Sequence, residues 1–525
     1  MKTRHRSRQH SPAHGKHRQV VPRSIPAGAA ELEIRFEVPE GAWEALAQEM
    51  SGFDTHALAL HATYADTPGR DLARAGVALR VRLEGDRRVQ TLKSPGANAL
   101  ERLEDEVALG RAHDDQPWPA PDLNRHQSAA VQHVMRAALG LGSGEPLPAV
   151  APVFEVKVRR RVRRIAHGTS VIELALDDGL LLASGRRRPI RELELELVEG
   201  NTRDLVALAR RWRERWGLWV RMTSKAVRGD SLASGGIAGP PVAAAVPRVT
   251  RKQDTSEFTA AVLRACLDQV MGNASEVAAG SAADDHIHQL RVGLRRLRTA
   301  LRELPALASE GERFEPVLVT VFRGLGERRD RTHVLRRIQP LVEAAGGMPL
   351  RVPPDFDEGV DPVDLVRRGD FQDAMLGLLE RAQEVRSDPR QPVRRTVRAH
   401  LQKLHDQVTR EGRHFTRLSE ERQHRVRKRL KRLRYLSEFV APLYSAESVR
   451  HYLAGVKPAQ EALGDYNDEV MAQSLYEELV GSDPGAQFGV DWLRSRRGEQ
   501  AKVCRATLRK LQSHRPFWAK RCGGS

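Results

Sequence analysis

The sequence predicts a multidomain α+β protein, with a strand-rich N-terminal part followed by an all-helical C-terminal part. At 525 residues the chain is too long for one compact domain. Polar and apolar side chains alternate with a period of two up to about residue 198, and apolar residues recur at helical spacing after residue 250. Between them lies a stretch rich in Gly, Ala and Pro. We therefore expect a disordered basic tail at residues 1–27, a strand-rich domain at 28–230, a linker at 231–250 and a helical domain at 251–525.

The charge of the chain indicates polyanionic partners. The sequence carries 86 Lys and Arg against 68 Asp and Glu, which gives a formal net charge of +18 at pH 7. Nucleic acid, polyphosphate, nucleotides and an anionic membrane surface all suit this balance. Aromatic residues make up only 5% of the chain and do not interleave with its basic segments. Nucleic acid is therefore the weaker expectation, because single strands are bound by stacking on aromatic rings.

Cysteine usage and hydropathy favour a protein of the reducing cytoplasm. Cys266, Cys504 and Cys522 are far apart and form no CxxC pair, so neither a zinc site nor a disulfide framework is expected. No apolar run approaches the roughly 20 residues that span a bilayer. The basic N-terminus lacks the hydrophobic segment of a secretion signal. We expect no membrane insertion.

Alternation predicts the strands of the N-terminal domain. Residues 31–36, Glu-Leu-Glu-Ile-Arg-Phe, place two carboxylates and a guanidinium on one face and three apolar residues on the other. A turn at Gly85-Asp86 predicts a hairpin, and another at Asp178-Gly179 ends a strand. The remaining segments give expected strands at 79–83, 89–93, 102–107, 154–162, 171–177 and 190–198, and expected helices at 122–139 and 202–216.

The charges of these strands are segregated by sign. A solvated sheet face would more often mix signs within each strand, and that ordinary arrangement remains the alternative for any single strand. Carboxylates can hold hard divalent cations, and Arg and Lys can bind phosphate oxygens. The acidic strands contribute Glu33, Glu104, Glu106, Glu192, Glu194 and Glu196; the basic strands contribute Arg80, Arg82, Lys93, Lys157, Arg159 and Arg161.

An ordered set of motifs in this region resembles the CYTH superfamily of triphosphate tunnel metalloenzymes. The motifs are ELEIR at 31–35, YADTP at 64–68, ALRVR at 78–82, TLKS at 91–94, RLEDE at 102–106 and ELELEL at 192–197. The resemblance implies an eight-stranded antiparallel β-tunnel that binds triphosphate with Mg²⁺ or Mn²⁺. The first family motif ends in Lys, and Arg35 stands there instead, which keeps the charge but cannot give up a proton.

The resemblance also implies roles for individual residues. Catalytic roles are expected for Glu31, Glu33, Arg35 and Lys93. The expected metal ligands are Glu31, Glu33, Glu104, Glu106, Asp177, Glu192, Glu194 and Glu196. The expected phosphate-binding residues are Arg80, Arg82, Lys93, Lys157, Arg159, Arg161 and Lys225.

The helical part contains an internal repeat. The segment from His288 to Arg298 matches the segment from His424 to Arg434, and each is followed by a Leu-Gly motif, at Leu325 and at Leu463. Two similar helical bundles related by a pseudo-twofold are expected. On each repeated helix the cations share one face, whereas leucines take the opposite face.

This part resembles the CHAD domain, a helical module associated with inorganic polyphosphate and often fused C-terminal to a CYTH domain. By this resemblance the polyphosphate-binding surface would comprise His288, Arg291, Arg295, Arg298, His424, Arg427, Lys431 and Arg434.

Together these features predict metal-dependent hydrolysis of inorganic or nucleoside triphosphate in the tunnel and binding of polyphosphate by the helical domain, with localisation to the cytoplasm and polyphosphate granules. Phosphoryl transfer to water needs mainly positioning and charge neutralisation, which such a tunnel supplies. The alternatives are a non-catalytic polyphosphate-binding protein, in which Arg35 has silenced the chemistry, an adenylyl cyclase and a nucleic-acid binder.

Overall fold

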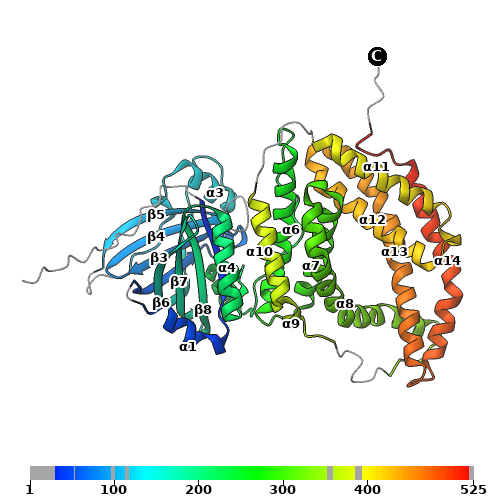
Figure 1. The fold of residues 1–525 in the computed structure, drawn as a ribbon, viewed down its shortest axis with the longest axis horizontal. Helices are drawn as coiled ribbons and strands as arrows, with labels where there is room; N and C mark the ends of the chain where they lie inside the picture. The colour runs from blue at the N-terminus through cyan, green and yellow to red at the C-terminus, as the bar shows by residue number, and fades with distance from the viewer. Residues whose placement is uncertain are drawn as a thin grey trace, which may run out of the picture.

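The structure is a computed structural model that describes residues 30–52, 54–95, 101–112, 118–351, 359–384 and 393–519. Figure 1 shows a β-barrel at one end of the molecule and a large assembly of helices at the other, with α4 and α10 between them. The expected basic tail, residues 1–27, lies outside the described residues. An α+β protein with a strand-rich N-terminal part and a helical C-terminal part is confirmed.

Eight antiparallel strands form the barrel. They pair in the order β5-β4-β3-β2-β6-β7-β8-β1, and pairing of β1 with β5 closes the ring. Closure leaves an inner and an outer face, and alternate residues of every strand point to each. The strands are β1 (Ala30–Glu37), β2 (His56–Asp66), β3 (Ala78–Glu84), β4 (Arg87–Pro95), β5 (Glu101–Arg111), β6 (Ala151–His167), β7 (Ser170–Ala183) and β8 (Arg186–Glu199).

A ninth, two-residue strand adds to the eight that were expected. β9 (Trp219–Val220) pairs with β1 through Phe36 and Glu37. It lies on the side of the barrel that faces the helical domain, because the Val220 N–H donates to Gln372 Oε1 of α10 at 2.9 Å. The extra strand therefore belongs to the junction of the two domains.

Two expected boundaries are wrong. β7 continues through Asp178-Gly179 and turns at Ser184-Gly185. Gly179 is required inside the strand, since a Cβ there would lie 2.0 Å from the Lys157 carbonyl oxygen. The helix expected at 122–139 begins only at Ala129, where the Ser128 side chain caps the Val131 N–H.

Among the described residues, the α-helices that accompany the barrel are α1 (Glu40–Glu49), α2 (Asp71–Arg74), α3 (Ala129–Leu139), α4 (Thr202–Trp216) and α5 (Lys225–Ala233). The outward residues of β1, β7 and β8, such as Ile34, Leu174 and Leu195, are buried in one core with α1 and α4. Inside the barrel an apolar cluster that includes Phe154 and Leu181 packs against Leu232 of α5. These contacts leave the charged face of β1 and β8 directed into the barrel.

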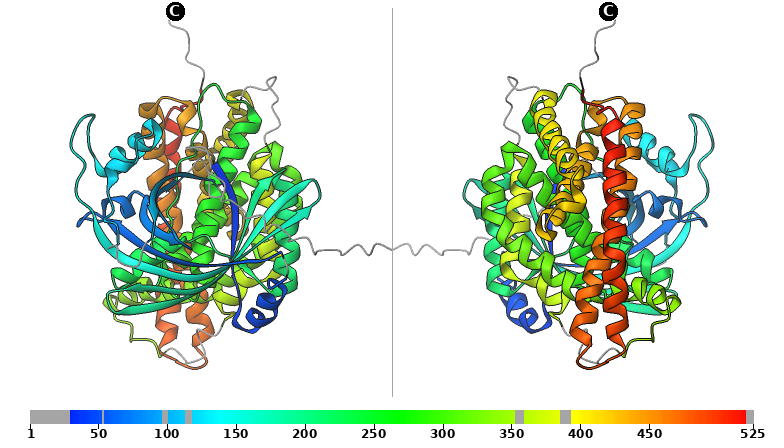
Figure 2. Two further views of the ribbon diagram at one scale, coloured as in Figure 1. Left: turned by 90° about the vertical axis from the view of Figure 1, so that its left-hand side faces the viewer. Right: turned by 90° about the vertical axis from the view of Figure 1, so that its right-hand side faces the viewer.

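The helical domain contains α6 (Thr255–Ala278), α7 (Asp284–Glu303), α8 (Ala308–Ala344), α9 (Pro362–Arg367), α10 (Gly369–Gln383), α11 (Val393–Gly412), α12 (Glu420–Val440), α13 (Ala446–Leu479) and α14 (Ala486–Ser513). The two repeated segments lie in α7 and α12, and each is followed by a long helix that carries the Leu-Gly motif. Figure 2 shows α13 and α14 side by side at the far end of the molecule.

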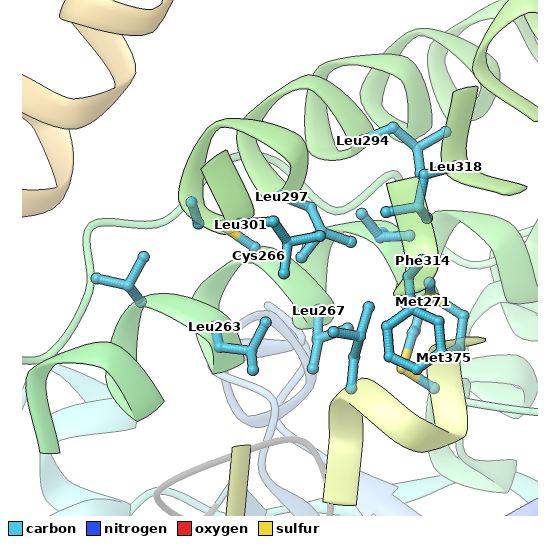
Figure 3. Close-up of a cluster of buried hydrophobic side chains, with 14 of the residues drawn as sticks. Leu263, Cys266, Leu267, Met271, Leu294, Leu297, Leu301, Phe314, Leu318 and Met375 are labelled. Atoms are coloured by element: carbon cyan, nitrogen blue, oxygen red, sulfur yellow. The ribbon is translucent and has the colours of Figure 1, made fainter. Parts of the chain in front are cut away.

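One hydrophobic core runs through both domains. Leu263 and Leu267 of α6 pack against Leu297 and Leu301 of α7 in the part of the core that Figure 3 shows. The same contiguous cluster includes Ile34 of the barrel. Val334 and its neighbours on α8, α13 and α14 form a separate, smaller cluster. The barrel and the first helices therefore pack as one body.

Residues 237–249 connect the domains without helix or strand, yet they are bound to α6 and α7. Asn273 bonds both the N–H and the carbonyl of Val242. The Gly239 N–H donates to Glu276, and the Ala245 carbonyl accepts from Arg296. This connector is an ordered strap on the helical domain.

None of the helices in the described ranges has both the length and the apolar character needed to cross a membrane. Cys266 and Cys504 are buried free thiols, and Cys522 lies outside the described residues.

Candidate functional site

The interior of the barrel is lined by charged residues of both signs. Glu33 and Arg35 of β1, Glu192, Glu194 and Glu196 of β8, and Asp177 of β7 occupy the inward phase of their strands, since the alternate residues pack in the outer core. The acidic inward phase expected from the sequence is therefore the one that the structure has.

A lysine ammonium lies at the centre of a carboxylate group. Lys225 Nζ is 2.8 Å from Asp177, 2.6 Å from Glu192 and 2.8 Å from Glu194. Ser224 caps α5, so Lys225 stands on the first turn of a fixed helix. Although burial opposes it, the three carboxylates raise the pKa of Lys225 above its usual value. The ligand oxygens of these acids lie within 4.8 Å of one another, the spacing of a metal site, and Lys225 now neutralises them.

Arginines complete this group. Arg160 donates to Asp177 and Glu194 at 2.7 and 2.6 Å, and Arg35 donates to Glu194 at 3.0 Å and also pairs with Glu33. Although burial alone would raise it, Arg228 and Lys225 lower the pKa of Glu192 to about 2. The inner half of the barrel is thus an ionised, mutually compensated network.

Nearby, three carboxylates face one another across neighbouring strands. Glu196 lies directly opposite Glu33 of β1 and opposite Glu173 of β7. Burial, followed by repulsion from Glu173 and Glu33, raises the pKa of Glu196 to about 7. Like charges in directly opposite cross-strand positions are destabilising. Arg35 pairs with Glu33 and Arg164 pairs with Glu173 at 2.9 Å, so Glu196 is the member of this row whose charge is opposed. The oxygen donors of the row suit a hard divalent ion.

Basic side chains line the part of the barrel interior that β3 and β4 form. Arg80 and Arg82 of β3 lie 3.8 Å from Glu104 and 3.6 Å from Glu106 of β5, and Lys93 of β4 also pairs with Glu104. Tyr64 contributes a hydroxyl that accepts from Arg80 at 3.4 Å. Arg80 and Arg82 are mostly buried, so their charges act in a low-dielectric space on whatever enters it.

Three expected phosphate ligands lie elsewhere. Lys157, Arg159 and Arg161 are on the outward phase of β6, and Lys157 and Arg159 are exposed to solvent. The inward residue is Arg160, which the alternation of the sequence does not single out because the run Arg159-Arg160-Arg161 puts charge on both phases. Glu31 belongs to β1 opposite Arg102, but its side chain is outside the described residues.

Cations of α7 and α12 converge in the helical domain. Arg291 and Arg295 of α7 and Arg427 of α12 act on Lys431 of α12, and Asp468 of α13 is the opposing acid. Burial and then these cations lower the pKa of Lys431 to about 7. Both repeated helices therefore contribute to one cationic cluster.

Other members of the expected surface carry partners of their own. Arg298 forms a bidentate pair with Glu315, and Arg434 pairs with Glu438 and bonds Gln460. Burial, followed by the charges of Lys428 and Arg427, lowers the pKa of His424. Lys428, whose pKa is lowered by burial and then by Arg298, Arg323 and Arg302, was not anticipated from the repeat.

The structure defines a class of two-domain proteins, in which a closed antiparallel barrel with a charged interior is joined to a helical domain with a cationic cluster. Comparison with family models gives the same division into two domains. The model of the CYTH domain matches residues 29–229, and that of the CHAD domain matches residues 261–477. The chain combines a CYTH domain with a CHAD domain.

Individual relatives are distant. An inorganic triphosphatase of Haemophilus influenzae is 28% identical over 209 residues, which are 39% of this chain; the chain spans about half, 55%, of that relative's length. The CHAD domain of the plant Ricinus communis is 24% identical with a TM-score of 0.41, covering 53% of this chain and 98% of that one. HpAC1 from Hippeastrum, described as having a dominant triphosphatase activity, is 20% identical with a TM-score of 0.28, covering 39% of this chain and 96% of that one.

Proposed function

We propose that the barrel hydrolyses inorganic triphosphate with a divalent metal ion and that the helical domain binds polyphosphate. The observation that carries the first part is the facing of two walls inside one closed ring: Arg80, Arg82 and Lys93 against the row of Glu33, Glu173 and Glu196. A triphosphate needs cations for its oxygens and a metal held by carboxylates. The Haemophilus influenzae relative, named an inorganic triphosphatase, supports the same chemistry.

The carboxylates fit Mg²⁺ or Mn²⁺. Mg²⁺ is usually held by one or two carboxylates together with water and substrate phosphates, so a loose row suits it better than a closed cage. Glu196, Glu33 and Glu173 would hold the ion, which would neutralise developing phosphate charge. In that row Glu33 and Glu173 pair with arginines and Glu196 does not, whereas Lys225 contacts all three acids of the tighter group of Asp177, Glu192 and Glu194, which is therefore the less favoured metal site.

The reaction needs little else from the chain. Water attacks a terminal phosphorus, the phosphoanhydride P–O bond breaks, and orthophosphate and pyrophosphate leave. Arg80, Arg82 and Lys93 orient the chain of phosphates and offset its charge. Arg35 and Arg160, each bonded to Glu194, keep that carboxylate ionised and fixed so that it can orient the water. In this role Arg35 requires no proton transfer, so it can replace a lysine.

The test of hydrolysis is phosphate release from tripolyphosphate by the full chain with Mg²⁺, with Mn²⁺ and with chelator. We expect release that depends on the metal. Absence of release in a protein that retains polyphosphate would overturn the catalytic proposal and favour a binding protein.

The test of polyphosphate binding compares two arginine reversals. Arg295→Glu lies in the cationic cluster of α7 and α12 and should weaken polyphosphate binding roughly tenfold or more. Arg159→Glu changes the net charge equally but lies on the outer face of β6, and it should have little effect. Equal losses in both variants would mean that binding follows net charge and not this cluster.

A further inference from the structure

A buried arginine joins the charges of the two domains. Arg221 follows β9 and is only 1% exposed. Its Nε lies 3.7 Å from the Glu37 carboxylate of β1, and its Nη2 lies 3.7 Å from the Glu276 carboxylate of α6. The Arg221 N–H donates to the Arg35 carbonyl at 2.7 Å, which fixes its backbone to the barrel wall. One guanidinium therefore stands between an acid of the barrel and an acid of the helical domain.

Glu276 is itself held by several groups. It accepts from the Thr223 hydroxyl and, at 3.0 Å, from the Gly239 N–H of the connector. Next to it, Ser275 Oγ accepts from the Met222 N–H at 3.0 Å. Although burial opposes it, Arg221 and Thr223 lower the pKa of Glu276. Glu276 is thus a fixed negative charge that the helical domain places against the barrel.

The other end of this row reaches the interior of the barrel. Glu37 is the cross-strand partner of Glu192, and Glu192 is bound by Lys225 and Arg228. Lys225 in turn contacts Asp177 and Glu194. A row of charged residues therefore runs from Glu276 of α6 through Arg221 to Glu37, whose carboxylate faces the like charge of Glu192 and lies in the field of Arg228, the arginine that pairs with Glu192. In a buried network each charge orients the next.

We propose that Glu276 of the helical domain is a positioning residue for the hydrolytic site, acting through Arg221 and Glu37 on the group of Glu192 and Lys225. This inference rests on the proposed triphosphatase function. Without the Glu276 charge, Arg221 would keep Glu37 as its acidic partner, so Glu37 would move toward Arg221 and its repulsion of Glu192 would change. Because Glu192 is one of the three carboxylates that hold Lys225, the position of Lys225 would change with it. The helical domain thereby sets the geometry of the barrel interior.

The test compares Glu276→Gln with a second interface variant in the full chain. Asp373 of α10 pairs with Arg213 of α4 at 2.9 Å across the same domain boundary, but α4 covers the outer face of the barrel. Both Glu276→Gln and Asp373→Asn remove one interdomain charge and should lower the melting temperature. Only Glu276→Gln should lower kcat, roughly tenfold with KM changed far less, as for other residues that orient active-site groups.

Two outcomes overturn the proposal: kcat of Glu276→Gln within about twofold of the wild type, or an equal loss in Asp373→Asn. The route is tested by adding Glu37→Gln, since residues of one network give non-additive effects and independent ones give additive effects. Additive effects on kcat would exclude the path through Glu37.

A wild-type protein without phosphate release would refute the proposed function separately. The effect of Glu276 on the barrel interior is then tested by measuring the affinity for tripolyphosphate by calorimetry. Glu276→Gln should weaken this affinity roughly tenfold, and Asp373→Asn should leave it unchanged. Unchanged affinity in both variants would refute the coupling.

Discussion

Glu196 and Lys431 are two half-buried groups whose surroundings disfavour their usual charge. Glu196 faces two other carboxylates across neighbouring strands, and Lys431 faces three arginines. Both pKa values move to about 7. Opposition of this kind is removed when a ligand of the complementary charge binds, so under the proposed function we expect a cation beside Glu196 and an anion beside Lys431.

Replacing Glu196 by Gln should abolish catalysis and stabilise the metal-free protein. Its native pKa lies above its unfolded value, so its stabilising contribution is present at pH 4.5 and lost as the pH rises through about 7. At pH 8 we expect Glu196→Gln to unfold at a higher temperature than the metal-free wild type. The expected gain in the free energy of unfolding is about 1–3 kcal/mol. Hydrolysis should fall at least roughly 100-fold.

Calorimetric melting at pH 5 and pH 8 and phosphate release check this prediction. Glu155→Gln on the outer face of β6 is the control: it should leave hydrolysis unchanged and, because it removes surface pairs with Lys157 and His61, should lower the melting temperature slightly rather than raise it. A destabilised Glu196→Gln variant would contradict the repulsion that the structure indicates.

Lys431 should make polyphosphate binding depend on pH. Its free-state pKa of about 7 rises when an anion binds, so binding takes up a proton above pH 7 and weakens as the pH increases. We expect roughly tenfold weaker binding at pH 8.5 than at pH 7. Lys431→Arg keeps its charge and should flatten this profile. Titrations of polyphosphate at constant ionic strength measure it, and identical profiles for the two proteins would disprove the role of Lys431.

Residues such as Glu194 could be predicted from the sequence because β8 alternates strictly between Glu and Leu. Arg160 could not, because its neighbours on β6 are also arginines and both phases of the strand look alike. Arg228 likewise carries no pattern of its own, and Glu173, which shares the phase of Asp177 on an alternating strand, was not singled out. They become part of the site only through the register of strands that the sequence does not specify.

At the scale of elements, the two Leu-Gly motifs differ in what surrounds the glycine. On α8 a Cβ at Gly326 would lie 2.1 Å from Arg291 Nη1, whereas a Cβ at Gly464 on α13 would meet nothing within 4 Å. The first glycine makes room for a guanidinium of the cationic cluster. Gly464 has no side chain packed against it among the described residues. The sequence repeat nevertheless presents the two glycines as equivalent.

The pair of alanine variants separates these roles. Gly326→Ala should displace the Arg291 guanidinium and weaken polyphosphate binding several-fold. Gly464→Ala should leave binding unchanged and raise the stability by about 0.5–1 kcal/mol, because Ala favours a helix interior. Binding titrations and thermal melts measure both. Equal binding by the two variants would show that Arg291 does not depend on Gly326.

The elements themselves were largely predictable where one period was sustained. α4 covers the expected residues 202–216, and α7 and α12 contain the repeated segments. The end of β7 was mispredicted because Asp-Gly usually marks a turn. At Gly179 the residue instead allows close approach of the β6 backbone, a reason that is visible only once β6 and β7 are paired.

For the whole molecule, the continuous core predicts cooperative unfolding of the two domains. Trp219 of β9 is 8% exposed, and the Arg367 guanidinium of α9 lies 3.8 Å from the centre of its ring. Gln372, Asp373 and Ser275 add polar contacts across the same boundary. Separate domain transitions would require water to enter a shared apolar cluster.

We expect differential scanning calorimetry to give one main transition for the barrel together with α6, α7 and α10. Trp219→Ala should destabilise this unit by about 3–5 kcal/mol. Trp492→Ala, a change of the same size on the partly exposed side of the smaller cluster, should cost less. Two well-resolved transitions in the wild type, one for each domain, would contradict this expectation.

The strap formed by residues 237–249 has a consequence for how such proteins can be recombined. Its backbone is bound by Asn273, Glu276 and Arg296, all of which belong to the helical domain. An exchange that joined this barrel to a foreign partner by breaking the chain before residue 237 would carry the strap away with α6 and α7. An exchange made after residue 249 would leave the strap on the barrel, without the side chains of the helical domain that bind its backbone. Gene shuffling should therefore conserve the strap as part of the C-terminal module, and functional chimaeras should be recovered only with the earlier breakpoint.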